Sequence, residues 1–213
     1  MMEKTIVIFA NSVKHHKHCV AGKDVVTNEW IRPVGDANGR ELTHEQVKCQ
    51  NPFGIFPTKI LQKVKINFIQ HAPLINQPEN YVISNNIWMQ NYKLDRSEII
   101  NYLDSPPNLW IDNISPNDRV DYQLIQKQII EITQSLYLIQ VEKIHIYWKD
   151  RSNLGRNPQR RGIFEYNHVS YDLPLTDPNF SEFEEQDLEN KILCISLGEE
   201  FNGYCYKLIA SIL

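Results

Sequence analysis

The chain has 213 residues, a formal net charge of −4 and a hydrophobic fraction of 42%. A chain of this length can bury a substantial core, either as one large domain or as two domains of about 100 residues each. The composition is that of an ordinary globular protein, and the negative charge argues against a protein that coats nucleic acid indiscriminately.

No stretch of the chain approaches the roughly 20 apolar residues that cross a bilayer, and Glu3 stands where an export signal would be basic. We therefore expect a cytoplasmic protein without a membrane partner. The cysteines are far apart in the sequence and form no C-x-x-C pair, which predicts thiols rather than a disulfide framework.

Short β-branched runs predict strands in residues 5–11 and 29–34. Residues 42–50 are expected to form one or two helical turns, with Thr43 as N-cap and Gln46 in the reciprocal position, and residues 51–58 are expected to form a turn.

Apolar Val64, Ile66 and Phe68 alternate with polar neighbours, which predicts a half-buried strand within residues 59–72. The best helix prediction of the first half is residues 94–107, with Asp95 as N-cap and Glu98 in the reciprocal position.

Residues 105–121 are rich in Pro, Asn and Asp, and we predict that they separate an N-terminal half, 1–115, from a C-terminal half, 116–213. Strand-like runs follow at 134–150, 161–175, 191–198 and 204–213, with a hairpin around Asn167 and His168. Two strand-rich halves with a few short helices predict a mainly β, α+β fold of small barrels rather than a βαβ nucleotide fold.

The stretch ANSVKHHKHCVAGK, residues 10–23, concentrates histidines and lysines after the first strand. His16, His18 and Cys19 could ligate a metal, but a structural zinc needs four ligands, so we predict no metal and no cofactor. No second closely spaced pair follows, because the later candidates are isolated in the sequence: His44, Cys49, His71 and His145. Cys19 could instead be a nucleophile that a neighbouring base activates, or simply a small buried thiol.

A third interpretation of the same stretch is anion binding. Lys14, Lys17 and Lys23 would contact phosphates, and Asn11 and Ser12 would supply directional donors. A solvated polar loop remains the alternative.

Two further stretches suit a nucleic-acid ligand. Trp30 and Arg32 lie on one side of an extended chain and could stack a base and pair a phosphate, although a strand tryptophan is more often part of a core. Residues 149–162 form the most basic loop; its arginines either bind phosphates or pair with the acidic segment 182–189. These arginines are Arg151, Arg156, Arg160 and Arg161.

The combination of ANSVKHHKHCVAGK and EWIRPV near the start, SLYLIQVEKIHI in the middle, YDLPLTDP later and SLGEEFNGYCYKLIASI at the end resembles the dual OB-containing domain family of bacteria. The resemblance spans nearly the full chain. It implies two OB-like β-barrels packed into one compact unit, in proteins associated with defence and genome conflict, and it implies no established reaction. The positions that match are Asn11, Ser12, Lys14, Cys19, Gly22, Trp30, Arg32, Asp177, Gly198, Glu199 and Lys207.

We therefore expect a module that binds single-stranded nucleic acid or a nucleotide through the lysine-rich stretch, Trp30, Arg32 and the arginine loop. One alternative is an enzyme on a nucleotide or nucleic acid, with Cys19, Asp177, Glu199 and Lys207 converging in one pocket. Another is an interaction subunit of a defence assembly, whose acidic segment 182–189 and exposed edge strands engage a partner protein.

Overall fold

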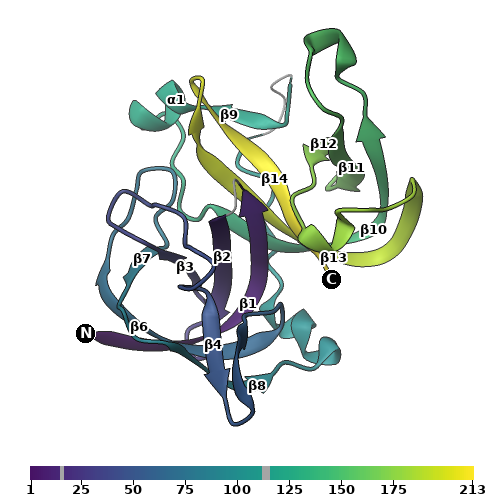
Figure 1. Ribbon diagram of the computed structural model, residues 1–213. Coiled ribbons are helices and arrows are strands. Elements are labelled where there is room, and N and C mark those ends of the chain that lie inside the picture. The colour runs from purple at the N-terminus through teal and green to yellow at the C-terminus, as the bar shows by residue number, and fades with distance from the viewer. Residues whose placement is uncertain (15–16, 112–115) are drawn as a thin grey trace. The chain divides into compact units, whose positions relative to one another are not determined.

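The computed structural model describes residues 1–14, 17–111 and 116–213 (Figure 1). The chain forms two compact units, Met1–Leu103 and Asp104–Leu213. The division predicted from the sequence, after residue 115, falls at the end of residues 112–115, which lie outside the described part. Within the described ranges no helix is long and apolar enough to cross a membrane.

The first unit is built from strands and one short 3-10 helix. In chain order these are β1 (Met2–Lys14), β2 (Lys17–Asp24), β3 (Trp30–Val34), β4 (Lys48–Asn51), β5 (Gly54–Pro57), β6 (Gln62–His71), β7 (Asn80–Ile83), β8 (Trp88–Lys93) and η1 (Arg96–Tyr102).

Five of these strands close into a barrel in the order β1-β2-β3-β7-β6, because β6 pairs back to β1. The β3–β7 pairing is parallel and the others around the barrel are antiparallel. The alternation predicted for β6 is confirmed, since Val64, Ile66 and Phe68 are fully buried. Strands β8, β4 and β5 extend the same sheet beyond β6.

The second unit is again dominated by strands. Its elements are β9 (Arg119–Asp121), α1 (Tyr122–Gln126), β10 (Leu136–Lys149), η2 (Ser152–Leu154), β11 (Gln159–Tyr166), β12 (Val169–Pro174), η3 (Pro178–Phe180), β13 (Gln186–Phe201) and β14 (Tyr204–Ile212).

The sheet of the second unit has the order β12-β11-β10-β13-β14-β9 and curls until Leu175 and Ile209 form a parallel bridge. Counting β10 to β14 as strands one to five, the first strand pairs with the second and fourth, and the third meets the fifth in parallel. Strands β1, β2, β3, β6 and β7 have the same connectivity. The prediction of a mainly β chain with two OB-like barrels is confirmed.

Several local predictions can be compared with these elements. Asp95 and Glu98 form the predicted capping box, but the element that follows is the 3-10 helix η1. Asn167 and His168 form the predicted hairpin turn, with φ angles of 49° and 64°.

The helical turns predicted for residues 42–50 are wrong in their second part. Thr43 and Gln46 do exchange reciprocal hydrogen bonds of 2.9 and 3.3 Å, yet the chain only turns there and then enters β4. Val47 and Cys49 are fully buried, and β4 pairs with both β5 and β8. Sheet pairing therefore overrides the local helical preference. Residues 54–57, expected to be part of a turn, form strand β5.

Candidate nucleic-acid interface

The loop between β10 and β11, residues 150–158, is shaped by its own hydrogen bonds. Asp150 accepts bonds from the backbone N–H and the hydroxyl of Ser152, at 2.8 and 3.0 Å. Gly155 ends η2 in the left-handed conformation, with φ of 62°. Arg151 donates to the carbonyl of Asn157 at 3.0 Å. The loop therefore presents its charges from a defined turn.

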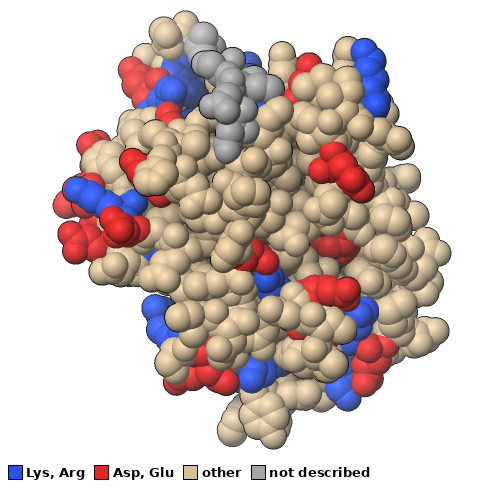
Figure 2. All heavy atoms as spheres, turned by 180° about the vertical axis from the view of Figure 1, so that it is seen from behind, with Lys and Arg blue, Asp and Glu red and all other residues tan. Residues whose placement is uncertain are grey.

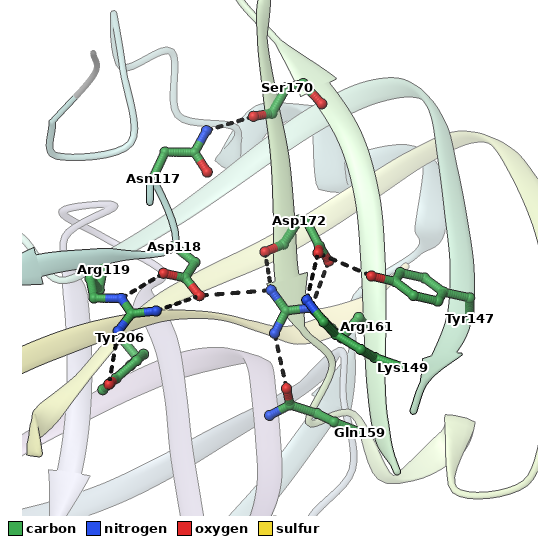
Figure 3. A network of polar contacts seen from close by, with 10 residues as sticks. All are labelled: Asn117, Asp118, Arg119, Tyr147, Lys149, Gln159, Arg161, Ser170, Asp172 and Tyr206. Atoms are coloured by element: carbon green, nitrogen blue, oxygen red, sulfur yellow. Dashed lines mark hydrogen bonds and ion pairs between the residues drawn. The ribbon is translucent and has the colours of Figure 1, made fainter. Parts of the chain in front are cut away.

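Two of the predicted arginines contact the body of the second unit. Arg160 donates to the carbonyl of Asp177 at 3.0 Å, and burial lowers its pKa. Arg161 is 6% exposed and lies at the centre of the network in Figure 3, with Nε 2.6 Å from a carboxylate oxygen of Asp172. Asp118 and Gln159 also contact its guanidinium, at 3.8 and 2.9 Å. Among the predicted arginines, Arg156 is the exposed one.

The acidic segment 182–189 has other partners than the loop arginines. Asp187 bonds Lys143 at 2.7 Å and His145 at 2.9 Å, and Glu185 lies 3.2 Å from His145. The contacts with Lys143 and His145 lower the pKa of the Asp187 carboxyl. Glu185 and Asp187 therefore pair with residues of β10. Arg160 and Arg161 instead contact Asp177 and Asp172, which lie outside the segment 182–189.

An aromatic residue that the sequence analysis did not select lies beside the basic loop. Trp148 is the second-last residue of β10 and pairs with Arg160 of β11. Its ring stacks on Phe183, with centroids 5.3 Å apart, and 41% of Trp148 is exposed. The signal in the sequence was an aromatic residue directly before the basic run.

A second cluster that was missed surrounds the turn between β13 and β14. The guanidinium of Arg119 lies over the rings of Tyr204 and Tyr206, 5.4 and 4.8 Å from their centroids. Phe201 is 60% exposed and packs toward Tyr206. Because Arg119 is far from these tyrosines in the sequence, only the β9–β14 pairing reveals the cluster.

In the first unit, three of the residues predicted to contact the ligand have buried side chains. Lys23 donates to the carbonyl of Tyr102 at 2.8 Å and lies 5.2 Å from the ring of Trp30. Arg32 forms a buried ion pair with Glu79 at 3.1 Å. A binding role for Lys23, Trp30 and Arg32 stays a prediction, and their contacts give each of them a part in the fold.

The remaining predicted residues of the first unit flank the β1–β2 turn. Lys14 and Lys17 are paired at the end of the hairpin, and Lys17 is exposed. Asn11 and Ser12 are partly buried; Asn11 donates to the carbonyl of Thr58 at 2.8 Å.

Asp177, a predicted catalytic carboxylate, is fully buried. One oxygen accepts a hydrogen bond from the N–H of Asn179 at 2.9 Å, and the other accepts one from the N–H of Ile212 at 3.0 Å. Burial raises the pKa of this carboxyl. The side chain caps η3 and joins it to the last strand.

The other catalytic candidates lie in different surroundings. Lys207 is fully buried, donates to the carbonyl of Ile111 at 3.1 Å and lies 5.3 Å from the ring of Tyr171. Glu199 is exposed on β13, and Cys19 belongs to the first unit. A catalytic pocket of these residues stays a prediction.

The described residues contain no group of three or more His, Cys, Asp and Glu side chains that could hold a metal ion. His16, one of the considered ligands, lies outside the described residues. His18 lies against His44, which the sequence could not pair with it.

The surface in Figure 2 carries its charges in small groups, with lysines and arginines interspersed among acidic residues. On the described part of this face, the charges therefore form no large field of one sign.

A family model described as the dual OB-containing domain matches residues 4–212. The chain belongs to the dual OB-containing domain family. The resemblance seen in the sequence is thereby confirmed, and no curated protein matches the chain. OB barrels bind oligonucleotides or oligosaccharides across the second and third strands and through the loops after the first and fourth strands. The family thus suggests nucleic-acid binding at a coarse level.

In this dual OB-containing domain, the loop after the first strand joins β1 to β2 in one barrel and β10 to β11 in the other. Lys14 and Lys17 end the strands on either side of the β1–β2 turn, and the β10–β11 loop carries Arg151 and Arg156. The loop after the fourth strand of the second barrel carries Phe201 and Tyr204 at its ends.

Proposed function

We propose that the chain binds single-stranded nucleic acid or a nucleotide, and that the β10–β11 loop of the second barrel contacts the phosphates. The observation that carries this proposal is topological. The most basic loop of an acidic chain joins the first two strands of an OB-like barrel, where this fold contacts its ligands. Lys14 and Lys17 end the two strands at the corresponding turn of the other barrel.

The exposed charges of the β10–β11 loop support phosphate contacts. Arg156 is exposed, and the side chain of Lys149 at the loop's start is 49% exposed. The single acid of the loop, Asp150, has its oxygens occupied by Ser152. The loop and the residue before it thus carry three basic side chains, those of Lys149, Arg151 and Arg156, against this one carboxylate, a balance that favours contact with phosphates.

Aromatic side chains beside both ligand-binding loops support contacts with bases. Trp148 adjoins the first-to-second strand loop, and Phe201 and Tyr204 flank the fourth-to-fifth strand loop. Stacking on such rings is tolerant of sequence, because every base has an aromatic face. Arg160 and Arg161 take part by ordering the base of the loop. Following the family resemblance, we propose a setting in bacterial defence or genome conflict.

The test is a titration of the full chain against a fluorescently labelled oligothymidylate over a series of salt concentrations. We expect binding that weakens with salt, because each phosphate contact releases counterions. Arg156→Glu should weaken binding and reduce the slope of log K against log salt by about 1 or more.

Arg96→Glu is the matched control, since Arg96 is also an exposed arginine and begins η1 in the first unit, outside the first-to-second and fourth-to-fifth strand loops. It should leave the salt slope nearly unchanged. Absence of binding at low salt, affinity that does not respond to salt, or equal effects of the two reversals would refute the phosphate contacts.

A further inference from the structure

His18 and His44 are brought together by a backbone contact outside the named strand pairings. His18 of β2 exchanges two backbone hydrogen bonds with Leu42, at 2.8 and 2.9 Å. The chain then turns between Thr43 and Gln46. This places Nδ1 of His44 3.4 Å from Nε2 of His18, with the ring centroids 5.5 Å apart.

The protonation of His18 follows from its second neighbour. Asn11 donates its amide N–H to the carbonyl of Thr58 at 2.8 Å, so its amide oxygen faces Nδ1 of His18, also at 2.8 Å. An amide oxygen only accepts, and Nδ1 of His18 must therefore carry the hydrogen. In the neutral ring, the lone pair is on Nε2, the atom that faces His44.

The neutral ring is the form that ligates metals, and metal-bound histidines commonly donate their other N–H to an oxygen acceptor that fixes the ring. Asn11 provides such an acceptor.

The separation of the two nitrogens suits one ion between them. Two histidine nitrogens at 2.0–2.1 Å from a tetrahedral zinc ion are about 3.3 Å apart, close to the 3.4 Å observed. A direct hydrogen bond between ring nitrogens is shorter, about 2.9–3.0 Å.

We propose that His18 and His44 form a two-histidine site for a divalent transition-metal ion of the zinc class. Among the described residues no third His, Cys, Asp or Glu joins the pair, so water would complete the coordination of a bound ion. The nearby Glu45 is engaged by Lys48 at 2.6 Å. The bound ion would link β2 to the segment between β3 and β4, independently of any nucleic-acid ligand.

The test is calorimetric titration of the full chain with Zn²⁺, with Co²⁺ absorption spectra as a second readout of histidine ligation. We expect one saturable site, a raised Tm in the presence of Zn²⁺, and no comparable binding of Mg²⁺, which prefers oxygen ligands. His44→Ala should weaken Zn²⁺ binding at least tenfold. Because His44 is exposed, this variant should fold normally.

Asn11→Ala should weaken Zn²⁺ binding by about 10–100-fold, as loss of an outer-shell partner typically does. His168→Ala is the control, because His168 is fully exposed in the other unit. Zn²⁺ binding that survives His44→Ala would show that His44 is not a ligand and would overturn the proposal. Absence of Zn²⁺ binding to the wild-type chain would overturn it as well.

Discussion

Gly22 in β2 and Gly162 in β11 occupy equivalent positions in the two barrels. Gly22 pairs with Ile8 of the first strand and Ile31 of the third. Gly162 likewise pairs with residues of β10 and β12, the first and third strands of its barrel. At both positions a Cβ atom would meet atoms of the first strand, so the absence of a side chain permits close packing inside a curled sheet.

The two glycines should nevertheless differ in their tolerance of alanine. A Cβ at Gly22 would overlap the backbone carbonyl of Val7, which cannot move without disturbing β1. A Cβ at Gly162 would meet the Cδ1 atoms of Ile144 and Ile209, both at 2.7 Å, and these side-chain ends can change rotamer. We expect Gly22→Ala to lower the free energy of unfolding by about 3 kcal/mol and Gly162→Ala by about 1 kcal/mol.

Urea unfolding of the two variants measures this difference. If the two losses are equal, or if Gly162→Ala loses more, the prediction is wrong. The cost of adding a Cβ atom would then not depend on whether that atom meets backbone or a side-chain end.

The strand-rich character of the fold could be predicted because it depends on local patterns. Alternating Val64, Ile66 and Phe68 indicated β6, and two consecutive turn residues indicated the Asn167–His168 hairpin. The closures of the two sheets could not be derived from local pattern, since the β1–β6 pairing and the Leu175–Ile209 bridge join residues far apart in the sequence.

The exposure of a candidate residue could be predicted where that residue lies in a loop, as Arg156 does. It could not be predicted at Lys23, Arg32 and Arg161, because a charged side chain is expected at the surface unless a buried partner compensates it. Those partners, such as Glu79 for Arg32, come from distant segments. Sequence reasoning therefore identified basic stretches but not which of their charges face the solvent.

Arg161 should contribute to stability more than the exposed arginine of the same loop region. Its guanidinium contacts Asp172 through both a carboxylate oxygen and the backbone carbonyl. Arg161→Ala would leave Asp172, whose side chain is 35% exposed, without this partner. We expect a loss of about 2–3 kcal/mol in the free energy of unfolding.

Arg156→Ala is the appropriate comparison, and we expect a change within about 0.5 kcal/mol because the residue is exposed. The measurement is again urea unfolding at constant pH. A loss for Arg161→Ala no larger than that for Arg156→Ala would contradict a structural role of the network in Figure 3.

Asp177 should make stability depend on pH. Burial raises the pKa of this carboxyl above its ordinary value, so the native state holds the proton more tightly than the unfolded chain does. Its contribution to stability is therefore full below the ordinary carboxyl pKa, about pH 4, and is lost as pH rises through the raised pKa.

Asp177→Asn isolates that contribution. Asparagine can still cap η3, but its single side-chain oxygen cannot accept from both Asn179 and Ile212, and the lost hydrogen bond lowers the variant's stability by about 1 kcal/mol. This loss does not itself change with pH, whereas the wild type also loses the contribution of protonated Asp177 as pH rises. Urea unfolding at several pH values should show the stability difference between wild type and variant shrinking as pH rises. Parallel pH profiles would contradict the assignment.

Trp148 should report ligand binding directly if bases stack near the β10–β11 loop. It is 41% exposed, whereas Trp30 and Trp88 are 5% and 1% exposed. Addition of oligothymidylate should change the intrinsic fluorescence, and Trp148→Phe should remove most of that change while keeping an aromatic ring for stacking.

Trp148→Ala removes the ring and should weaken oligothymidylate binding by about 1–3 kcal/mol, the range for one stacked base. Because Trp148 also stacks on Phe183, the variant's fold must be checked by circular dichroism and by urea unfolding. If both variants bind as the wild type does, and the fluorescence change survives in Trp148→Phe, the bases stack elsewhere. The cluster of Arg119, Tyr204 and Tyr206 would then be the next surface to substitute, because it combines aromatic faces with a guanidinium at the fourth-to-fifth strand loop.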